Sequence, residues 1–476
     1  MANHKGDDVG TRLAAAGILA AGLAGAVVVP ARGEPSQKSL LEEERRRVLD
    51  QTIDQSQDFD YDFGGWLRVE YDTYDDAPYN ETRGLRFYDL RLWGSARVAE
   101  IHRVYARLLL QYTDFNRGDQ YGDSQSELNG PCLDQGFYEI DLAGAGAGLD
   151  RLVARGGRQF FQLGRGIVLN GTMDGLAVEG GEGGWAFKAL GAITIGAMDD
   201  IDLSRPNPDD SHRLFCGASV ESPDLGAFTR VYVFGLAQLD LNGRTPPGAG
   251  GIRYGYDSQY WAAGIRSQPL TSLDLRGELI FETGQSYPDP YTVAGDADPE
   301  SIRALCLDLV AEVHPDLPLG LRFSAEYLWG SGDADRMSVT DTVFGNEAGT
   351  ADEGFLAFGY VNTGIALFPR PSNLHMLRLG AAGRPLAALA DWLEALDVAL
   401  DWFYYRKDEK AGVISDARAD LPEAYVGMEI DLSVTWRPLS DLLASIRYGI
   451  FLPGDAYSSA TDDTRGFLSA SLTYMF

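Results

Sequence analysis

Arginine and acidic side chains recur at every second position along several segments, and these residues have the types and spacing that could do chemistry. Arg68 and Glu70, for example, alternate with the apolar Leu67 and Val69. The other basic residues with this spacing are Arg91, Arg97, Arg103, Arg107, Arg276, Arg322, Arg437 and Arg447. A guanidinium stays charged and donates a planar fork of hydrogen bonds that matches a carboxylate. The chemistry open to this set is therefore non-covalent recognition of carboxylates, within the chain or on a ligand.

Acidic residues share the same faces, so two interpretations of the arginines are open. The acids are Glu70, Asp89, Glu278, Asp308, Glu312, Glu326, Asp397, Asp401, Glu429 and Asp431. In the first interpretation, acids and arginines neutralise one another in a cross-strand ladder, because an unpaired charge near lipid is costly. In the second, the arginines of the first three segments form a one-sided track for an anionic solute.

The sequence offers no motif for bond chemistry. The five histidines lie at positions 4, 102, 212, 314 and 375, and none is at a metal-ligand spacing from another histidine or a cysteine. We find no Gly-x-Ser-x-Gly motif. The acidic residues 119–127 could hold calcium, but they lack the ligand order of an EF-hand. We therefore expect no enzyme, no metal site and no cofactor, and we assign no role to Cys132, Cys216 or Cys306.

The segments that position these side chains repeat apolar and polar residues with a period of two, which predicts β-strands rather than helices. Clear examples are Leu396 to Tyr405 and Leu442 to Leu452. Tight connections alternate with long, mostly acidic ones, and about eighteen strands can be counted. We therefore predict an all-β fold, a transmembrane antiparallel up-and-down β-barrel with short periplasmic turns and long extracellular loops. A barrel of this size is wide enough for an aqueous channel.

The longest connection, residues 331–373, contains a strand-like stretch from Phe355 to Phe368. Counting this stretch as a strand would make the number odd, whereas an even number places both chain ends in the periplasm. We therefore hypothesise that it folds inward and constricts the lumen. Another long connection is expected over residues 114–135.

The N-terminus predicts export. Lys5 and Arg12 precede an apolar run that ends at Val29, and Ala31-Arg32-Gly33 suits cleavage by signal peptidase. The expected organisation is a signal peptide over 1–33, a partly helical periplasmic extension over 34–60 and the barrel over 61–476. After the signal, no apolar stretch reaches the roughly 20 residues that a membrane helix needs.

The last strand, residues 466–476, ends the chain on an aromatic residue. One face carries Leu472, Tyr474 and Phe476, and the other is small and mostly hydroxylic. This strand resembles the closing strand of bacterial outer-membrane barrels, whose terminal aromatic is read by the barrel-assembly machinery. The resemblance implies that Phe476, Tyr474 and Leu472 form the assembly signal. The alternative is an edge strand of a soluble β-sandwich.

Two further stretches carry a more specific resemblance. Arg155-Gly-Gly-Arg-Gln-Phe-Phe161, with the loop that follows it, resembles the Gly-Arg-Gln strand and loop of the alginate export porins, and Tyr448 to Tyr457 is similar to the end of the same family. The resemblance runs from about Phe63 to Phe476. It implies a monomeric eighteen-stranded barrel that passes a linear polyuronate through an arginine-lined constriction. It also adds Arg155, Arg158 and Asp455 to the residues expected to line the pore or contact the substrate, and Arg165 matches the same region as Arg155.

The expected function is an outer-membrane channel that passively exports an anionic polysaccharide or oligosaccharide. Its expected partners are the passenger, outer-membrane lipid and the barrel-assembly machinery, and periplasmic export partners stay open. Nucleic acid is not expected, because 70 acidic residues against 40 basic ones give a net charge of −30. The alternative function is a general diffusion porin for small solutes or nutrients.

Overall fold

The computed structural model describes residues 59–476, apart from 77–80, 121–124, 145, 147, 197, 227, 243–250 and 293–297. The expected signal peptide over 1–33 lies outside the described residues. The expected periplasmic extension over 34–60 also lies outside them, except for Phe59 and Asp60, which open the first strand. No helix in the described part of the chain is long and apolar enough to cross a membrane.

The described residues form eighteen strands joined in chain order. The strands are β1 (Phe59–Asp76), β2 (Glu81–Val98), β3 (His102–Phe115), β4 (Ser126–Asp141), β5 (Arg151–Gln162), β6 (Asn170–Glu182), β7 (Trp185–Ile193), β8 (Arg213–Glu221), β9 (Arg230–Asp240), β10 (Tyr256–Leu270), β11 (Leu273–Ser286), β12 (Glu300–Val313), β13 (Arg322–Gly330), β14 (Leu374–Gly383), β15 (Leu396–Arg406), β16 (Tyr425–Leu439), β17 (Leu442–Pro453) and β18 (Arg465–Met475). Two short 3-10 turns, η3 (Pro318–Gly320) and η4 (Asp391–Leu393), lie between β12 and β13 and between β14 and β15.

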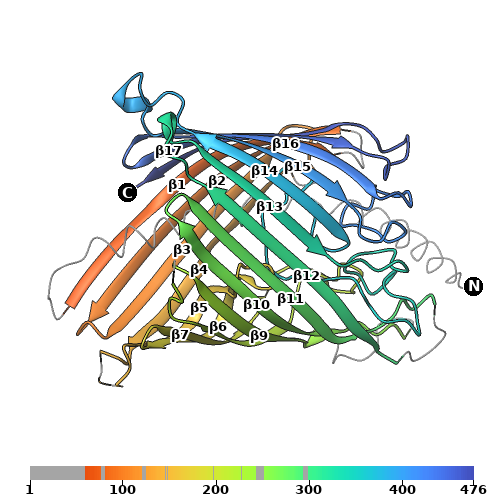
Figure 1. The fold of residues 1–476 in the computed structure, drawn as a ribbon, viewed down its shortest axis with the longest axis horizontal. Coiled ribbons are helices and arrows are strands. Elements are labelled where there is room, and N and C mark those ends of the chain that lie inside the picture. The colour runs from red at the N-terminus through yellow and green to blue at the C-terminus, as the bar shows by residue number, and fades with distance from the viewer. Residues whose placement is uncertain are drawn as a thin grey trace, which may run out of the picture.

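Each strand pairs antiparallel with its neighbours, and β1 also pairs with β18, which closes the sheet (Figure 1). The predicted all-β up-and-down barrel and its strand count are thus confirmed. Closure leaves no free sheet edge at the seam, as a bilayer requires, because an unpaired backbone group in lipid costs several kcal/mol.

Side-chain exposure along the strands is inverted relative to a soluble protein. On β1, the apolar Leu67 and Val69 are each 42% exposed, whereas Glu70 and Asp72 are buried. Since successive side chains point to opposite faces of a strand, the exposed apolar row faces lipid and the buried polar row faces the lumen. The period-two pattern therefore arises because alternate residues of each strand face lipid and the lumen.

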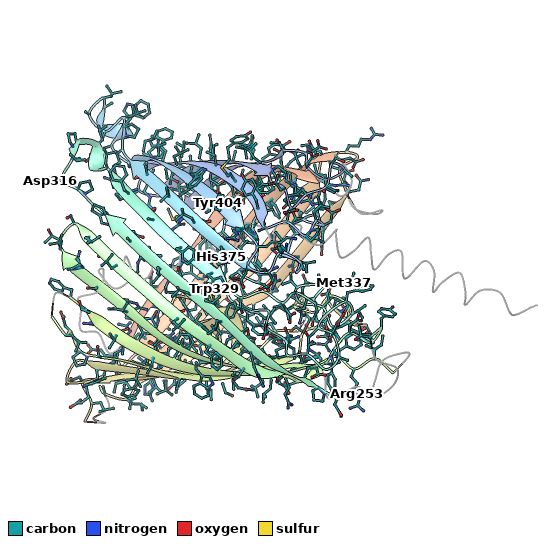
Figure 2. All side chains as sticks on the ribbon, turned by 45° about the vertical axis from the view of Figure 1, so that its right-hand side comes forward. Arg253, Asp316, Trp329, Met337, His375 and Tyr404 are labelled. Atoms are coloured by element: carbon teal, nitrogen blue, oxygen red, sulfur yellow. The ribbon has the colours of Figure 1, made fainter. Side chains whose placement is uncertain are left out.

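Tight turns gather at one end of the barrel and long loops at the other. The turns include residues 99–101, 183–184, 271–272 and 440–441, and the loops include 194–212, 331–373 and 407–424. Figure 2 shows Asp316, in the turn between β12 and β13, at the end opposite to Arg253 and Met337, which lie in loops. The tight turns are the periplasmic ones and the long loops are extracellular.

One predicted boundary was wrong. The long loop expected over 114–135 is much shorter, because β4 already begins at Ser126. Pro131 interrupts the pattern of this strand, since proline lacks a backbone N–H and is unusual within a sheet. The pairing of β3 with β4 also shifts register between Arg107 and Leu108 and between Leu109 and Gln111. These irregularities break the alternation that would have marked the strand.

Candidate functional site in the barrel lumen

The hairpin of β5 and β6 leaves the wall before it ends. Pairing of β4 with β5 stops at Gly136 and Arg158, and pairing of β6 with β7 stops at Asp174 and Ile193. The two strands of the hairpin nevertheless stay paired with each other as far as Gln162 and Asn170. Residues 159–173, which we call the hairpin tip, therefore have no backbone pairing with the neighbouring strands, although Lys188 of β7 donates to the Gln162 carbonyl at 3.2 Å.

The hairpin tip crosses the lumen to the opposite wall. The backbone N–H of Arg165 donates to Glu278 Oε2 on β11 at 2.9 Å. The Arg165 guanidinium forms an ion pair with Asp308 on β12 and a second with Glu326 on β13, where Nη2 lies 3.3 Å from Oε1. Glu326 also binds Arg378 of β14 at 2.6 Å. One arginine thus fixes the tip to three adjacent strands.

The long loop between β13 and β14 packs against the hairpin tip. The N–H groups of Phe358, Gly359 and Tyr360 donate to the carbonyls of Val168, Ile167 and Gly166 at 3.0 to 3.2 Å. Phe355 is fully buried, and the Phe358 ring meets Tyr260 of β10 and Phe215 of β8 edge-on. The stretch from Phe355 to Phe368 therefore folds into the barrel, as hypothesised.

Carboxylates of the wall fasten this loop. Glu429 on β16 is completely buried and accepts the N–H groups of Ile365, Ala366 and Leu367 at 2.6 to 2.9 Å. Glu282 on β11 accepts the N–H of Leu356 at 2.9 Å. Burying a carboxylate is costly unless hydrogen bonds replace its water, and these backbone donors do so. Acids that the sequence places inside the barrel thus hold a loop as well as neutralise arginines.

A cavity of about 1550 Å³ opens beneath the tip and the loop. Its roof includes Phe160, Leu163, Tyr360 and Ile365, and its walls reach Arg384 near the periplasmic turns. The basic residues of its lining are Arg68, Arg165, Lys188, Arg266, Arg276, Arg322, Arg378, Arg384, Arg437 and Arg447. The acidic residues of its lining are Glu326, Glu394, Asp397, Asp401 and Asp431. The exposed lining therefore has ten basic and five acidic side chains, in a chain whose net charge is −30. Five further acids that pair with these basic residues lie outside the lining: Glu70, Glu179, Glu221, Asp308 and Glu312.

Five of the expected arginines meet in this cavity: Arg68, Arg276, Arg322, Arg437 and Arg447. Arg68 pairs with Glu70 at 2.5 Å, and Arg322 donates to both oxygens of Asp397 at 2.8 Å. Arg276 pairs with Glu312. These three pairs match the neutralising ladder, although Glu70 and Glu312 lie outside the lining, which exposes mostly basic side chains.

Another group of expected arginines is built into the wall around β2 to β5. Arg91 and Arg107 are buried, both bind Asp134, and both lie over the Trp66 ring. Arg155 pairs with Glu139 at 2.5 Å. Arg103 donates to Ser95 Oγ at 3.0 Å, and Arg97 faces it as its partner in the pairing of β2 with β3. None of these five wall arginines belongs to the described cavity lining. Of the expected arginines on the first three strands, Arg68 alone belongs to this cavity lining, and its other basic residues come from the hairpin tip, later strands and a turn.

Two expected residues lie apart from the cavity. Arg158 binds Asp174 through two bonds of 2.8 and 2.9 Å and the carbonyl of Leu133, at the place where the hairpin leaves the wall. It does not belong to the cavity lining, so a role for Arg158 in the pore stays a prediction. Asp455 is an exposed residue of the external loop 454–464 and lies outside the cavity lining.

Sequence reasoning missed several cavity residues. Arg266 of β10, Arg378 of β14 and Lys188 of β7 were not singled out, although each has the alternation of its strand as a signal. Arg384 lies in a turn and carries no such signal. Arg165 was matched only by family resemblance, because a loop residue shows its direction only after the loop is folded.

Metal-ligand geometry occurs once in the described part of the chain. Ligand atoms of Asp274, Glu312 and His314 lie within 4.8 Å of one another near the periplasmic turns. His314 Nε2 is 3.3 Å from Asp274. All three side chains are accessible and Glu312 already pairs with Arg276, so the arrangement is explained by ion pairing.

The C-terminal residues complete the seam. The Phe476 N–H and carbonyl exchange hydrogen bonds of 3.0 and 2.8 Å with Gly65 of β1. The side chains of Leu472, Tyr474 and Phe476 are 48%, 47% and 57% exposed on the outer face. The last residue is therefore part of the wall, with its ring on the lipid side.

A closed eighteen-stranded barrel with a lipid-facing apolar surface and a charged lumen defines an outer-membrane channel. The chain belongs to the Alginate export family, whose match covers residues 59–471. No curated protein matches the chain.

Solved structures with the same fold are outer-membrane proteins at low sequence identity. OpdK of Pseudomonas aeruginosa, solved with vanillate, is 12% identical with a TM-score of 0.53 over 88% of this chain and 98% of that one. OccAB1 of Acinetobacter baumannii is 12% identical with a TM-score of 0.55 over 87% and 96% of the two chains. At this identity the similarity shows the fold alone.

Proposed function

We propose that this channel exports an anionic polysaccharide of the polyuronate class by passive passage through the lumen. The observation that carries the proposal is the basic excess of the cavity beneath the hairpin tip, ten basic side chains against five acidic ones. A carboxylate placed there meets guanidinium groups on several sides, each able to bind it through two parallel hydrogen bonds. Membership of the Alginate export family supports both the passenger and the direction.

Passage requires binding that is favourable yet exchangeable. Most lining arginines already share an acid, as Arg322 shares Asp397 and Arg378 shares Glu326. A guanidinium has five N–H donors, so a passing carboxylate would share it with the resident acid and would not have to displace that acid. The arginine then has a partner before, during and after passage, and binding of the passenger stays weak enough to exchange. The acids of the lumen thus fit the proposal, since they return the arginines to a paired state after the passenger moves on.

The test is ion selectivity in planar bilayers. Wild-type protein should prefer anions and be blocked by polyuronate but not by a neutral glucan of the same length. Removing three half-exposed lining arginines together, Arg266→Gln, Arg322→Gln and Arg384→Gln, should lower the anion preference severalfold and shorten the blocks. Arg151→Gln, which removes an equally exposed charge outside the cavity lining, is the control. Weak cation selectivity with no effect of polyuronate would instead identify a general diffusion porin for small solutes.

A further inference from the structure

A second basic cluster lies at the external end of the lumen. Arg465 is the first residue of β18, and Arg418 and Asp416 belong to the loop between β15 and β16. Arg465 Nη1 lies 2.5 Å from Asp416 Oδ2, and Arg418 Nε lies 2.9 Å from Asp416 Oδ1. Two guanidinium groups from distant parts of the chain thus converge on one carboxylate.

The cluster is rigidly built. Arg465 is 3% exposed, and its guanidinium lies 5.3 Å from the ring centre of Phe451 and 5.0 Å from that of Tyr457. The Tyr457 hydroxyl donates to Asp416 Oδ2 at 2.8 Å. Arginine stacked on aromatic faces is held in one orientation, which fixes the direction of its remaining donors.

The donors outnumber the acceptors. Arg465 Nε and Nη2 and Arg418 Nη1 are buried atoms with no hydrogen-bond partner among the described residues. Asp416 cannot accept these donors as well. Its two oxygens already accept hydrogen bonds from both guanidinium groups, the Tyr457 hydroxyl and the backbone N–H of Arg418. Buried donors are nearly always paired in proteins, so these three call for an acceptor.

The charges are also unbalanced. Burial alone would raise the pKa of Asp416, but Arg465 and Arg418 more than offset burial and hold that pKa below its usual range. Asp416 is therefore ionised, and two positive charges face one negative charge. An acceptor with one negative charge would balance this cluster.

We propose that Arg465 and Arg418 form a binding site for one carboxylate, an external subsite separate from the cavity beneath the hairpin tip. Arg465 lies on the same face of β18 as Ser471 and Thr473, which line that cavity. A chain that leaves the cavity outward along β18 would reach this buried cluster through Arg418, whose side chain is 22% exposed. The part of the proposal that makes a uronate of the exported chain the ligand rests on the proposed function. The oxyanion site itself does not.

The first experiment measures binding without transport. Thermal unfolding of the purified full-length protein in detergent is followed with sodium glucuronate replacing sodium chloride at constant ionic strength. Binding to the folded state should raise the unfolding temperature by a few degrees in a saturable manner. Arg465→Lys and Arg418→Lys keep the charge but remove the unpaired donors, so either change should reduce the shift to the part that the cavity beneath the hairpin tip contributes. Arg336→Lys alters a buried loop arginine that binds Asp352 and should keep it. Equal shifts in all variants, or none in wild type, would overturn the site.

The second experiment locates the site along the channel. Short oligouronates added on the extracellular side should block wild-type channels for longer than Arg418→Lys channels, and blocks from the periplasmic side should be unchanged. A carboxylate-dependent thermal shift without any block would leave the anion site standing and refute the polyuronate passenger. Blocks from both sides that are indifferent to Arg418→Lys would support transport and refute the external subsite.

Discussion

The carboxylate of Asp202, in the loop between β7 and β8, is almost fully buried and has no ion pair with a basic side chain among the residues that the structure describes. Burial is the largest cause that raises its pKa, to about 6, and the charge of Asp341 raises it further. Hydrogen bonds from Ser204 and Thr342, both 2.6 Å long, act in the opposite direction. The ionised form of Asp202 therefore destabilises the folded protein at neutral pH.

Stability should depend on pH through Asp202. Its folded-state pKa of about 6 exceeds the ordinary 3.8, so the folded protein binds the proton more tightly and loses stability as pH rises between these values. Asp202→Asn should therefore be more stable than wild type near pH 7, by on the order of 1–3 kcal/mol, and equal to it below about pH 4. Thermal unfolding in detergent across this range measures the difference. Asp209→Asn, at an exposed position of the same loop, should show no such trend. A less stable Asp202→Asn at neutral pH would contradict the prediction.

Arg158 and Arg165 show how far single residues could be predicted. Both belong to the motif that carries the family resemblance, but Arg158 closes a gap in the wall and Arg165 reaches across the lumen. Alternation assigns a face only while a strand stays in the sheet. Since the hairpin leaves the wall after Arg158, no counting along the sequence could place the residues of its tip.

The elements that narrow the lumen are segments that have left the pairing of the barrel wall. The tip of the β5–β6 hairpin has lost both outer neighbours, and it is rebuilt inside the barrel against residues 355–368 and a buried apolar cluster that includes Leu163, Ile167 and Phe355. The inward loop was predictable, because counting residues 355–368 as a strand would have made the number of strands odd. The sequence carries no comparable signal for the tip, because a hairpin that bends inward keeps the composition of any other hairpin.

Glu429 should control how firmly the inward loop is held. Glu429→Gln replaces one acceptor oxygen by an NH₂ group that faces backbone donors. The lost hydrogen bonds should destabilise the docked loop by about 1–3 kcal/mol. We expect larger current noise in single channels and faster trypsin cleavage after Arg336 in intact outer membranes. Wild type should resist this cleavage, since Arg336 is buried. Glu353→Gln, an exposed change in the same loop, is the control. Rapid cleavage of the wild-type loop would show that it does not lie in the lumen.

The whole molecule separates its charges by location. The chain carries −30 overall, yet the exposed lining of the cavity beneath the hairpin tip has ten basic and five acidic side chains. Composition alone therefore could not predict this lining, because a net charge does not say where in the fold the charged residues lie. Barrel closure, in contrast, was predictable, since the alternation, the turn lengths and an even strand number depend on the bilayer and not on the passenger.

The end of the chain offers a way to separate assembly from stability. Phe476 closes the seam through its backbone. Its side chain is 57% exposed, and its ring centre lies 6.0 Å from the ring centre of Tyr474. Phe476→Ala keeps the backbone bonds, so protein refolded in detergent should unfold within a few degrees of wild type. If the ring is the signal that the assembly machinery reads, the amount of folded barrel in cells should nevertheless fall severalfold, measured by heat-modifiable mobility in gels. Tyr448→Ala, an exposed aromatic on the outer face of β17, should leave both quantities unchanged. Equal losses in cells and in detergent would assign Phe476 to stability instead, because the defect would then follow from the folded wall and require no reader.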